Sequence, residues 1–238
     1  MTQGILDSLI ASIICFALGY GFARARQQWE LRVFRTIWGQ LETRRRVSVV
    51  VSTRPGPHPR STPRVSLNEM QAFVTISETL RDLGSGVIAV DGDCRLKDIS
   101  GESLVLLGGP AANKVTADVW QRIQTRLPLT FDVNKFSLSV SDRVYAPQED
   151  VTGRLSKDYA LLARVSDAVG AGQQVFLCCG CHGFGTLGAA MALADKKILA
   201  HIGKKIPRKQ DFCAILEMDI PQGRVSPPRL RELFVVPS

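Results

Sequence analysis

VFLCCGCHGFGTLG, residues 175–188, is the stretch that decides the fold. An apolar run from Val175 to Cys179 gives way to a glycine-dense turn at 180–186, and the alanine-rich residues 189–194 then favour a helix. This order of strand, tight loop and helix is typical of parallel α/β sheets, whose carboxyl edge is where ligands bind. Backbone N–H groups and the positive end of the helix would face such a ligand. The stretch therefore predicts a parallel sheet and a site at its edge.

A second strand and glycine turn precede this stretch in the chain. Residues 103–107, SLVLL, have the composition of a buried strand, and GGPAAN follows at 108–113. Apolar residues between 115 and 127 then recur at helical spacing. Two such turns at one edge would form opposite walls of a crevice. Gly108 and Gly109 would let the backbone approach a ligand, and Asn113 would either cap the following helix or bond the ligand.

The remaining segments complete an α/β domain over residues 47–238. Residues 47–52 and 86–90 predict buried strands on either side of a helix that opens with the capping-box pattern SLNE at 66–69. Short alternating segments between 129 and 147 predict antiparallel strands or an insertion beside the parallel sheet, and residues 158–165 predict a further strand. The fold class we expect is α/β, with a Rossmann-like, mostly parallel sheet and an antiparallel insertion.

A proline-rich loop follows the first predicted strand. Its four prolines between 55 and 63 are incompatible with a helix or a central strand, and the loop would leave the same edge of the sheet as the glycine turns. We interpret it either as a lid over the site or as a solvated surface loop. As a lid it would offer an anionic ligand the side chains of Arg54, His58, Arg60 and Arg64.

The first 46 residues predict a membrane anchor. Residues 5–22 are apolar apart from Asp7 and a few small polar residues, and they approach the length that a helix needs to cross a bilayer. Arginines follow this run rather than precede it, which argues against a cleaved signal peptide. The positive-inside rule then places residues 24–238 in the cytoplasm. We expect a transmembrane helix at 1–23 and a basic amphipathic helix at 24–46, in a single-pass protein of the cell membrane.

Both N-terminal segments also allow a second interpretation. The apolar run is short enough to be a buried or amphipathic helix of a soluble protein. In the segment that follows, Trp29 and Trp38 suit a membrane interface, but the same helix would also pack on the globular domain or on its own copy in a dimer.

Cys178, Cys179, Cys181 and His182 suggest three chemistries. The C-x-x-C-H spacing matches covalent haem attachment, although that attachment belongs outside the cytoplasm. Zinc is opposed by the crowding of the ligands, because neighbouring strand residues face opposite ways. Cys181 at a helix N-terminus, with His182 as base, would suit nucleophilic catalysis. Core packing of buried thiols is the remaining explanation, so we assign no catalytic residue, no metal ligand and no cofactor.

Ligand binding without chemistry is the use of these loops that we favour. The loop at 180–186 has neither the lysine of the phosphate-binding P-loop nor the G-x-G-x-x-G pattern. Its glycines would allow a ligand to approach the backbone closely, while a threonine, a histidine and a strand arginine supply polar groups. The predicted ligand-binding residues are Gly108, Gly109, Asn113, Arg164, Gly180, His182, Gly183, Gly185 and Thr186. Arg164 has an alternative structural role, pairing with Asp158.

Three motifs together resemble a known pattern: GGPAAN at 108–113, DYALLAR at 158–164 and GCHGFGT at 180–186. The pattern is that of uncharacterised prokaryotic Rossmann-like domains, some of them coupled to membrane segments, and the resemblance covers residues 47–220. It implies the fold but no activity, so no catalytic residue is carried over. In plan, a membrane helix on such a domain is similar to effectors of prokaryotic defence systems that sense cyclic nucleotides.

These observations predict a membrane-anchored, cytosolic sensor of a nucleotide or another small anionic ligand, acting in signalling or defence as a homo-oligomer. One alternative is a nucleotide-processing hydrolase or transferase using Cys181 and His182; another is a non-catalytic membrane-tethered interaction module. The net charge is +8, but the basic residues are not interleaved with aromatic ones and the sequence has no known nucleic-acid-binding motif. We therefore do not infer nucleic-acid binding.

Overall fold

The computed structural model describes residues 2–39, 46–54, 64–99, 103–207 and 210–237. Its main sheet has eight strands, in the order β11-β10-β8-β9-β3-β1-β2, with β7 paired to β8. The strands are β1 (Arg46–Val51), β2 (Gly86–Asp91), β3 (Ser103–Leu107), β7 (Gln148–Glu149), β8 (Leu155–Ser166), β9 (Gln174–Gly180), β10 (Phe212–Asp219) and β11 (Arg229–Val235).

The sheet combines two kinds of pairing. Strands β2, β1, β3 and β9 run parallel to one another, whereas β8 is antiparallel to β9 and β10, and β10 is antiparallel to β11. A separate three-stranded antiparallel sheet is formed by β4 (Thr130–Asp132), β5 (Ser137–Val140) and β6 (Arg143–Tyr145). The prediction of an α/β fold with a parallel core and added antiparallel strands is therefore confirmed.

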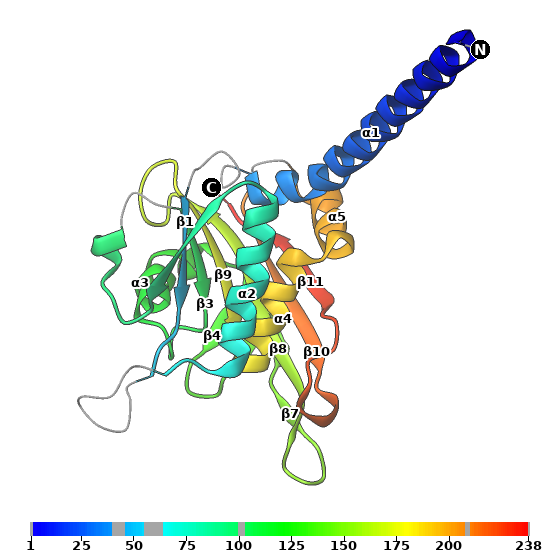
Figure 1. Cartoon of the computed structure of the whole chain (residues 1–238). Helices are drawn as coiled ribbons and strands as arrows, with labels where there is room; N and C mark the ends of the chain where they lie inside the picture. The colour runs from blue at the N-terminus through cyan, green and yellow to red at the C-terminus, as the bar shows by residue number, and fades with distance from the viewer. Residues whose placement is uncertain (1, 40–45, 55–63, 100–102, 208–209, 238) are drawn as a thin grey trace.

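Helices cover both faces of the main sheet (Figure 1). On one face lie α2 (Leu67–Asp82), α4 (Gly183–Ala194), α5 (Lys196–Lys205) and the end of α1 (Thr2–Trp38). On the other lie α3 (Lys114–Ile123) and the small sheet. Short 3-10 turns occur at η2 (Leu96–Ile99), η3 (Gln124–Arg126) and η4 (Pro221–Gly223). Because side chains alternate along a strand, Cys178 belongs to the core under α4 and Cys179 to the core under α3.

The alanine-rich segment forms the predicted helix, α4, and a second helix, α5, follows it directly. Asp195 has an extended backbone and interrupts the helical run after α4. Its carboxylate accepts the N–H groups of Lys197 at 2.7 Å and Ile198 at 2.9 Å, so it caps α5. A short acidic side chain competes well for N-terminal N–H groups, which explains the break.

The last turn of α1 is part of the domain core. Ile37 and Trp38 are fully buried, and the Trp38 ring lies 4.9 Å from that of Phe176. Its indole Nε1–H donates to the Leu193 carbonyl at 3.3 Å, near the end of α4. Of the two interpretations of Trp38, packing on the globular domain is therefore correct; the side chain of Trp29 lies outside the described residues.

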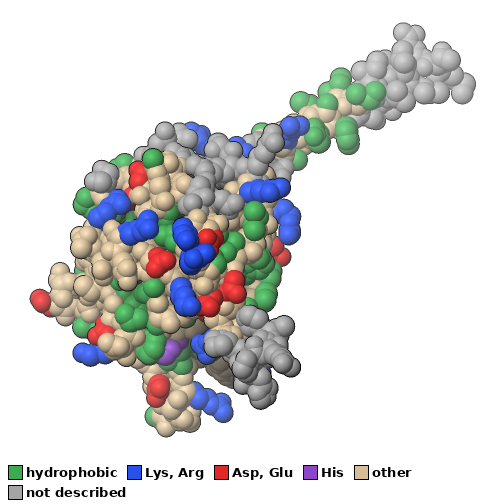
Figure 2. All heavy atoms as spheres, turned by 90° about the vertical axis from the view of Figure 1, so that its left-hand side faces the viewer, with side chains coloured by type: hydrophobic (Ala, Val, Ile, Leu, Met, Phe, Trp, Pro, Cys, Tyr) green, Lys and Arg blue, Asp and Glu red, His purple; other side chains and the backbone are tan. Residues whose placement is uncertain are grey.

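The N-terminal part of α1 projects from the domain (Figure 1). Figure 2 shows hydrophobic side chains at the surface of its described portion. The side chains of Ile13, Ile14, Phe16, Leu18, Tyr20 and Phe22 are all more than half exposed. Within the described residues, none of the helices has the length and apolar character required to cross a membrane.

Candidate functional site

A pocket of about 540 Å³ opens at the carboxyl edge of the parallel strands. Its walls are the segments that follow β1, β3 and β9, together with the start of α2 and the hairpins formed by β4–β5 and β7–β8. Six predicted ligand-binding residues line it: Gly108, Gly109, Gly180, His182, Gly183 and Thr186. The two glycine loops thus line one cavity, but they form neighbouring walls rather than the predicted opposite ones, because β3 and β9 pair directly.

The turn after β9 requires glycine at its first position. A Cβ atom on Gly180 would lie 2.1 Å from the His182 carbonyl oxygen and 2.2 Å from the Thr186 nitrogen, because the chain folds back on itself there. The Thr186 hydroxyl closes the turn by accepting the Gly180 N–H at 3.2 Å. Thr186 therefore supports the loop from inside while also lining the pocket.

Asp158, near the start of β8 and beside this turn, is the group that fixes the start of α4. Its fully buried carboxylate accepts the N–H groups of Gly185 at 2.6 Å, Tyr159 at 2.8 Å and His182 at 3.2 Å. Burial raises the pKa of the Asp158 carboxyl, and the three hydrogen bonds and the nearby His182 ring oppose that rise. Two N–H groups at the helix start already have an acceptor in Asp158, so this helix end is only partly available to a ligand.

Gly185 packs on this carboxylate rather than into the pocket. A Cβ atom there would lie 2.4 Å from the Tyr159 carbonyl oxygen and 3.0 Å from an oxygen of Asp158. At the other loop, Gly108 has a φ of +101°, and a Cβ atom on it would meet Ser52 at 3.1 Å. Both glycines are required by the backbone, one for close approach and the other for its left-handed conformation.

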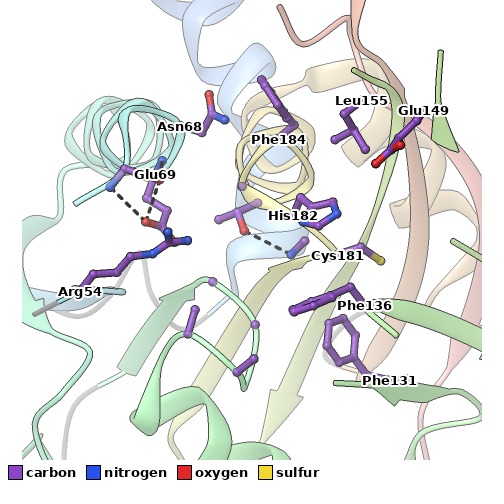
Figure 3. A pocket seen from close by; sticks show the side chains of 18 of the residues that line it. Arg54, Asn68, Glu69, Phe131, Phe136, Glu149, Leu155, Cys181, His182 and Phe184 are labelled. Carbon is purple, nitrogen blue, oxygen red and sulfur yellow. Dashed lines mark hydrogen bonds between the residues drawn. The ribbon is translucent and has the colours of Figure 1, made fainter. Parts of the chain in front are cut away.

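One side of the pocket is polar and carries charges of both signs (Figure 3). Arg54, which follows β1, and Glu69, in the first turn of α2, both line it. Glu69 completes the predicted capping box with Ser66, whose hydroxyl donates to the carboxylate at 2.8 Å. The Ser52 hydroxyl donates to the other oxygen of Glu69. The carboxylate is thereby held in place, 5% exposed, at the cavity wall.

The opposite side of the pocket is aromatic (Figure 3). Phe136, from the β4–β5 hairpin, stacks on the exposed His182 ring with centroids 5.5 Å apart and planes 28° apart. Phe131 lies beside it and is itself packed edge-on against Trp120 at 6.1 Å. His182 precedes α4 without a side-chain capping bond, so its ring is not used to cap the helix and lies at the pocket wall.

Besides Gly185, two predicted ligand-binding residues lie outside the pocket lining. Asn113 is buried and caps α3, accepting the Thr116 N–H at 3.0 Å and donating to the Leu107 carbonyl at 3.1 Å. Arg164 pairs with Phe176 at the beginning of β9, whereas the pocket lies at the end of that strand. The structure therefore gives Asn113 the capping role that the sequence allowed and does not bring Arg164 to the pocket.

Arg164 instead holds the end of α1. Its buried guanidinium donates to the carbonyls of Ile37 at 2.7 Å, Thr36 at 3.4 Å and Gln210. Such a cation stabilises the carbonyl end of a helix. The predicted pairing of Arg164 with Asp158 is not formed, because the two residues lie toward opposite ends of β8.

The cysteines of the C-x-x-C-H motif are buried on different faces of the sheet. Cys178 and Cys181 belong to separate cores, so their thiols do not face one common group. Burial raises the pKa of the Cys181 thiol, and the Asp158 charge raises it further. Over the part of the chain that the structure describes, no three His, Cys, Asp or Glu side chains are grouped as a metal site.

The predicted lid falls mostly outside the described residues. Arg54 and Arg64, at its two ends, are joined by backbone hydrogen bonds of 2.8 and 2.9 Å, while His58 and Arg60 lie between the described ranges.

On the face shown in Figure 2, lysine and arginine side chains are interspersed with acidic ones.

Several pocket residues are absent from the sequence predictions. The sequence predicts only a capping-box role for Glu69. Its place in the pocket could have been inferred, because α2 follows β1 and therefore begins at the same end of the sheet as the glycine loops. Phe131 and Phe136 carried no signal, because their contact with the pocket depends on how the small sheet packs against the main one.

No family model matches this sequence, and a search of curated proteins finds no match.

Proposed function

We propose that this chain is a membrane-attached sensor whose Rossmann-like domain binds a nucleotide or another small anionic ligand. The observation that carries the proposal is the pocket between the Gly108 and Gly180 loops, because two glycine turns at the carboxyl edge of parallel strands are a recurrent ligand-binding arrangement. Its volume of about 540 Å³ falls within the range of about 300–1,000 Å³ common for small-molecule sites.

The charges around the pocket favour a ligand with an anionic group and hydrogen-bond donors. Arg54 supplies a cation, and the N–H groups of Gly183 and Phe184 have no acceptor among the described residues. Glu69 and Glu149 add carboxylates to the same walls, which would repel a ligand that is anionic throughout. A phosphate joined to a sugar satisfies both conditions, since its hydroxyl groups would donate to a carboxylate.

The hydrolase or transferase alternative gains no support from its proposed nucleophile. Cys181 is 3% exposed, and its raised pKa keeps the thiol protonated at neutral pH. Hydrogen bonding joins His182 to Asp158 through the backbone N–H, and its ring stacks on Phe136. A histidine base oriented by a carboxylate, as nucleophilic catalysis requires, is thus not formed by these residues.

The first test is occupancy of the full-length protein. A native mass spectrum of the gently purified chain in detergent micelles should show a mass excess that is lost on denaturation. An excess that survives denaturation would instead indicate a covalent adduct on a cysteine and refute reversible binding. Ribose 5-phosphate then serves as a defined probe in isothermal titration calorimetry.

Arg54 and Arg64 provide a matched pair of variants. Both are exposed and joined by a backbone bridge, but only Arg54 lines the pocket. Arg54→Ala should weaken ribose 5-phosphate binding about tenfold, because a charge-assisted hydrogen bond contributes about 1.5–3 kcal/mol. Arg64→Ala should leave it unchanged. Equal effects of the two variants, or no binding by the unmodified chain, would favour the non-catalytic interaction module.

Membrane attachment is the second part of the proposal and rests on α1. Six large apolar side chains on its projecting part are exposed, and surfaces of this kind mark membrane or protein contacts. Lys197, Lys204 and Lys205 on α5, which packs against α1, are exposed and would favour an anionic lipid surface. The full chain should sediment with phosphatidylserine-containing vesicles, and Phe16→Asp with Leu18→Asp should abolish this.

Self-association completes the proposed mechanism. Ligand binding at the start of α4 would bias how copies of the chain associate, which is how a sensor of this plan would signal, in defence or otherwise. Analytical ultracentrifugation with and without ribose 5-phosphate tests this step, and an unchanged oligomeric state would refute it.

A further inference from the structure

Phe136 has a backbone conformation that phenylalanine rarely adopts. Its φ of +49° lies in the left-handed region, where a bulky residue is an outlier. The preceding turn is fixed by Asp132, whose carboxylate accepts the N–H groups of Asn134 at 2.9 Å and Lys135 at 3.0 Å. Strain of this kind persists where the surrounding structure requires it, and it concentrates at ligand clamps.

Core packing does not explain this conformation. The Phe136 side chain is 41% exposed, in contrast to the neighbouring Phe131, which is 7% exposed and packed against Trp120. Phe136 instead places its ring on that of His182, at the wall of the pocket. The hairpin thus presents an exposed aromatic surface next to the cavity.

We propose that Phe136 and His182 form a stacking platform for the planar base of the ligand. This inference rests on the proposed function, with the sugar phosphate bound toward Arg54 and Glu69 on the opposite side (Figure 3). Every nucleobase has a π face, and stacking on an aromatic side chain strengthens nucleotide binding about five- to 150-fold. The base-dependent part of the affinity would therefore come from this pair.

The test compares ligands that differ only in the base. Affinities of the full chain for ribose 5-phosphate and for the four common ribonucleoside 5′-monophosphates are measured by titration calorimetry in detergent. At least one nucleotide should bind tenfold more tightly than ribose 5-phosphate, a difference of about 1.4 kcal/mol.

Phe136→Asn is the informative variant, because asparagine tolerates the left-handed backbone and so preserves the hairpin while removing the ring. It should reduce the advantage of the nucleotide to less than threefold and leave the affinity for ribose 5-phosphate unchanged. Phe136→Trp should retain the advantage. Val133→Asn, in the same turn but outside the pocket lining, is the control and should behave as the unmodified chain.

The possible outcomes separate this inference from the function on which it rests. If ribose 5-phosphate binds but no nucleotide binds more tightly, or if Phe136→Asn keeps the full advantage, the stacking platform is refuted and the anion site stands. If neither ribose 5-phosphate nor any nucleotide binds, the proposed function itself fails.

Discussion

Asp158→Asn should destabilise the protein, because the carboxylate is the common acceptor of the turn that shapes the pocket. Placed with its oxygen toward Gly185 and His182, an asparagine would turn its NH₂ group toward the Tyr159 N–H, which now lies 2.8 Å from the carboxylate. One buried donor then loses its acceptor, at a cost of about 1–3 kcal/mol. The two remaining bonds also lose the contribution of the charge.

Desolvation acts in the opposite direction. Burial raises the pKa of the Asp158 carboxyl, so removing the charge recovers part of the cost of burying it. We therefore expect a net loss of about 2 kcal/mol in the free energy of unfolding. The loss should be accompanied by weaker ligand binding, since the first turn of α4 would no longer be fixed.

The assay is urea denaturation of the full chain at pH 7, followed by circular dichroism. Asp118→Asn is the matched control, because Asp118 is an exposed carboxylate on α3, and it should change the free energy of unfolding by less than about 0.5 kcal/mol. If Asp158→Asn were as stable as this control, the carboxylate would not organise the turn and the account of the site would be wrong.

Two further predictions concern groups outside the pocket. Burial raises the pKa of Glu217, but hydrogen bonds from Arg231 and Arg229 outweigh it and hold the pKa at about 2. The stabilisation is complete above pH 4.5 and is lost as the pH falls toward 2; it should amount to about 2 kcal/mol, given about 1.4 kcal/mol per pKa unit and the partial exposure of both arginines. Urea denaturation at pH 7 and pH 3 is compared for the unmodified chain and Glu217→Gln, because Asp150 and Glu232, whose pKa values are also lowered, contribute to both. The stability difference between the two pH values should be smaller in Glu217→Gln; an unchanged pH dependence would contradict the assignment. In the native protein iodoacetamide should modify Cys94, which is partly exposed, well before Cys181, which is buried with a raised pKa; peptide mass spectrometry showing equal rates would refute the burial of Cys181.

The parallel part of the fold was predictable because the residues that follow each strand indicate its direction. Strand β3 is followed by Gly108 and β9 ends in Gly180, and a glycine turn that leads into a helix is the signature of a carboxyl strand end. The capping box at Ser66 and Glu69 was equally local, since both partners lie within four residues. Local chemistry of this kind can be inferred from one sequence.

Strand direction in the antiparallel part was not predictable, and this explains the position of Arg164. Residues 158–165 are apolar enough to fit a strand of either direction. Because β8 is antiparallel to β9, its Asp158 end lies at the pocket and its Arg164 end lies at α1. A parallel β8 would have reversed the two, bringing the arginine to the site.

Contacts between distant segments also could not be predicted from the sequence. Phe136 is 46 positions from His182, and nothing in its neighbourhood indicates that the two rings meet. The break at Asp195 is a local feature that the sequence also leaves open. An aspartate after an alanine-rich run is compatible with either a continuous helix or the cap of a new one.

Helix α1 is attached at the end of the sheet opposite to the pocket, and this placement bears on how a ligand would reach the protein. Arg164 fixes the end of α1 beside the first residues of β9, and the pocket lies at the last residue of that strand. The first and last of the seven residues of β9 are six steps apart, and at about 3.3 Å per step the two ends of the strand are about 20 Å apart. In a chain whose α1 enters a bilayer, the mouth of the pocket would face the aqueous phase, so a dissolved metabolite would enter directly whereas a lipid-borne molecule would first have to leave the membrane.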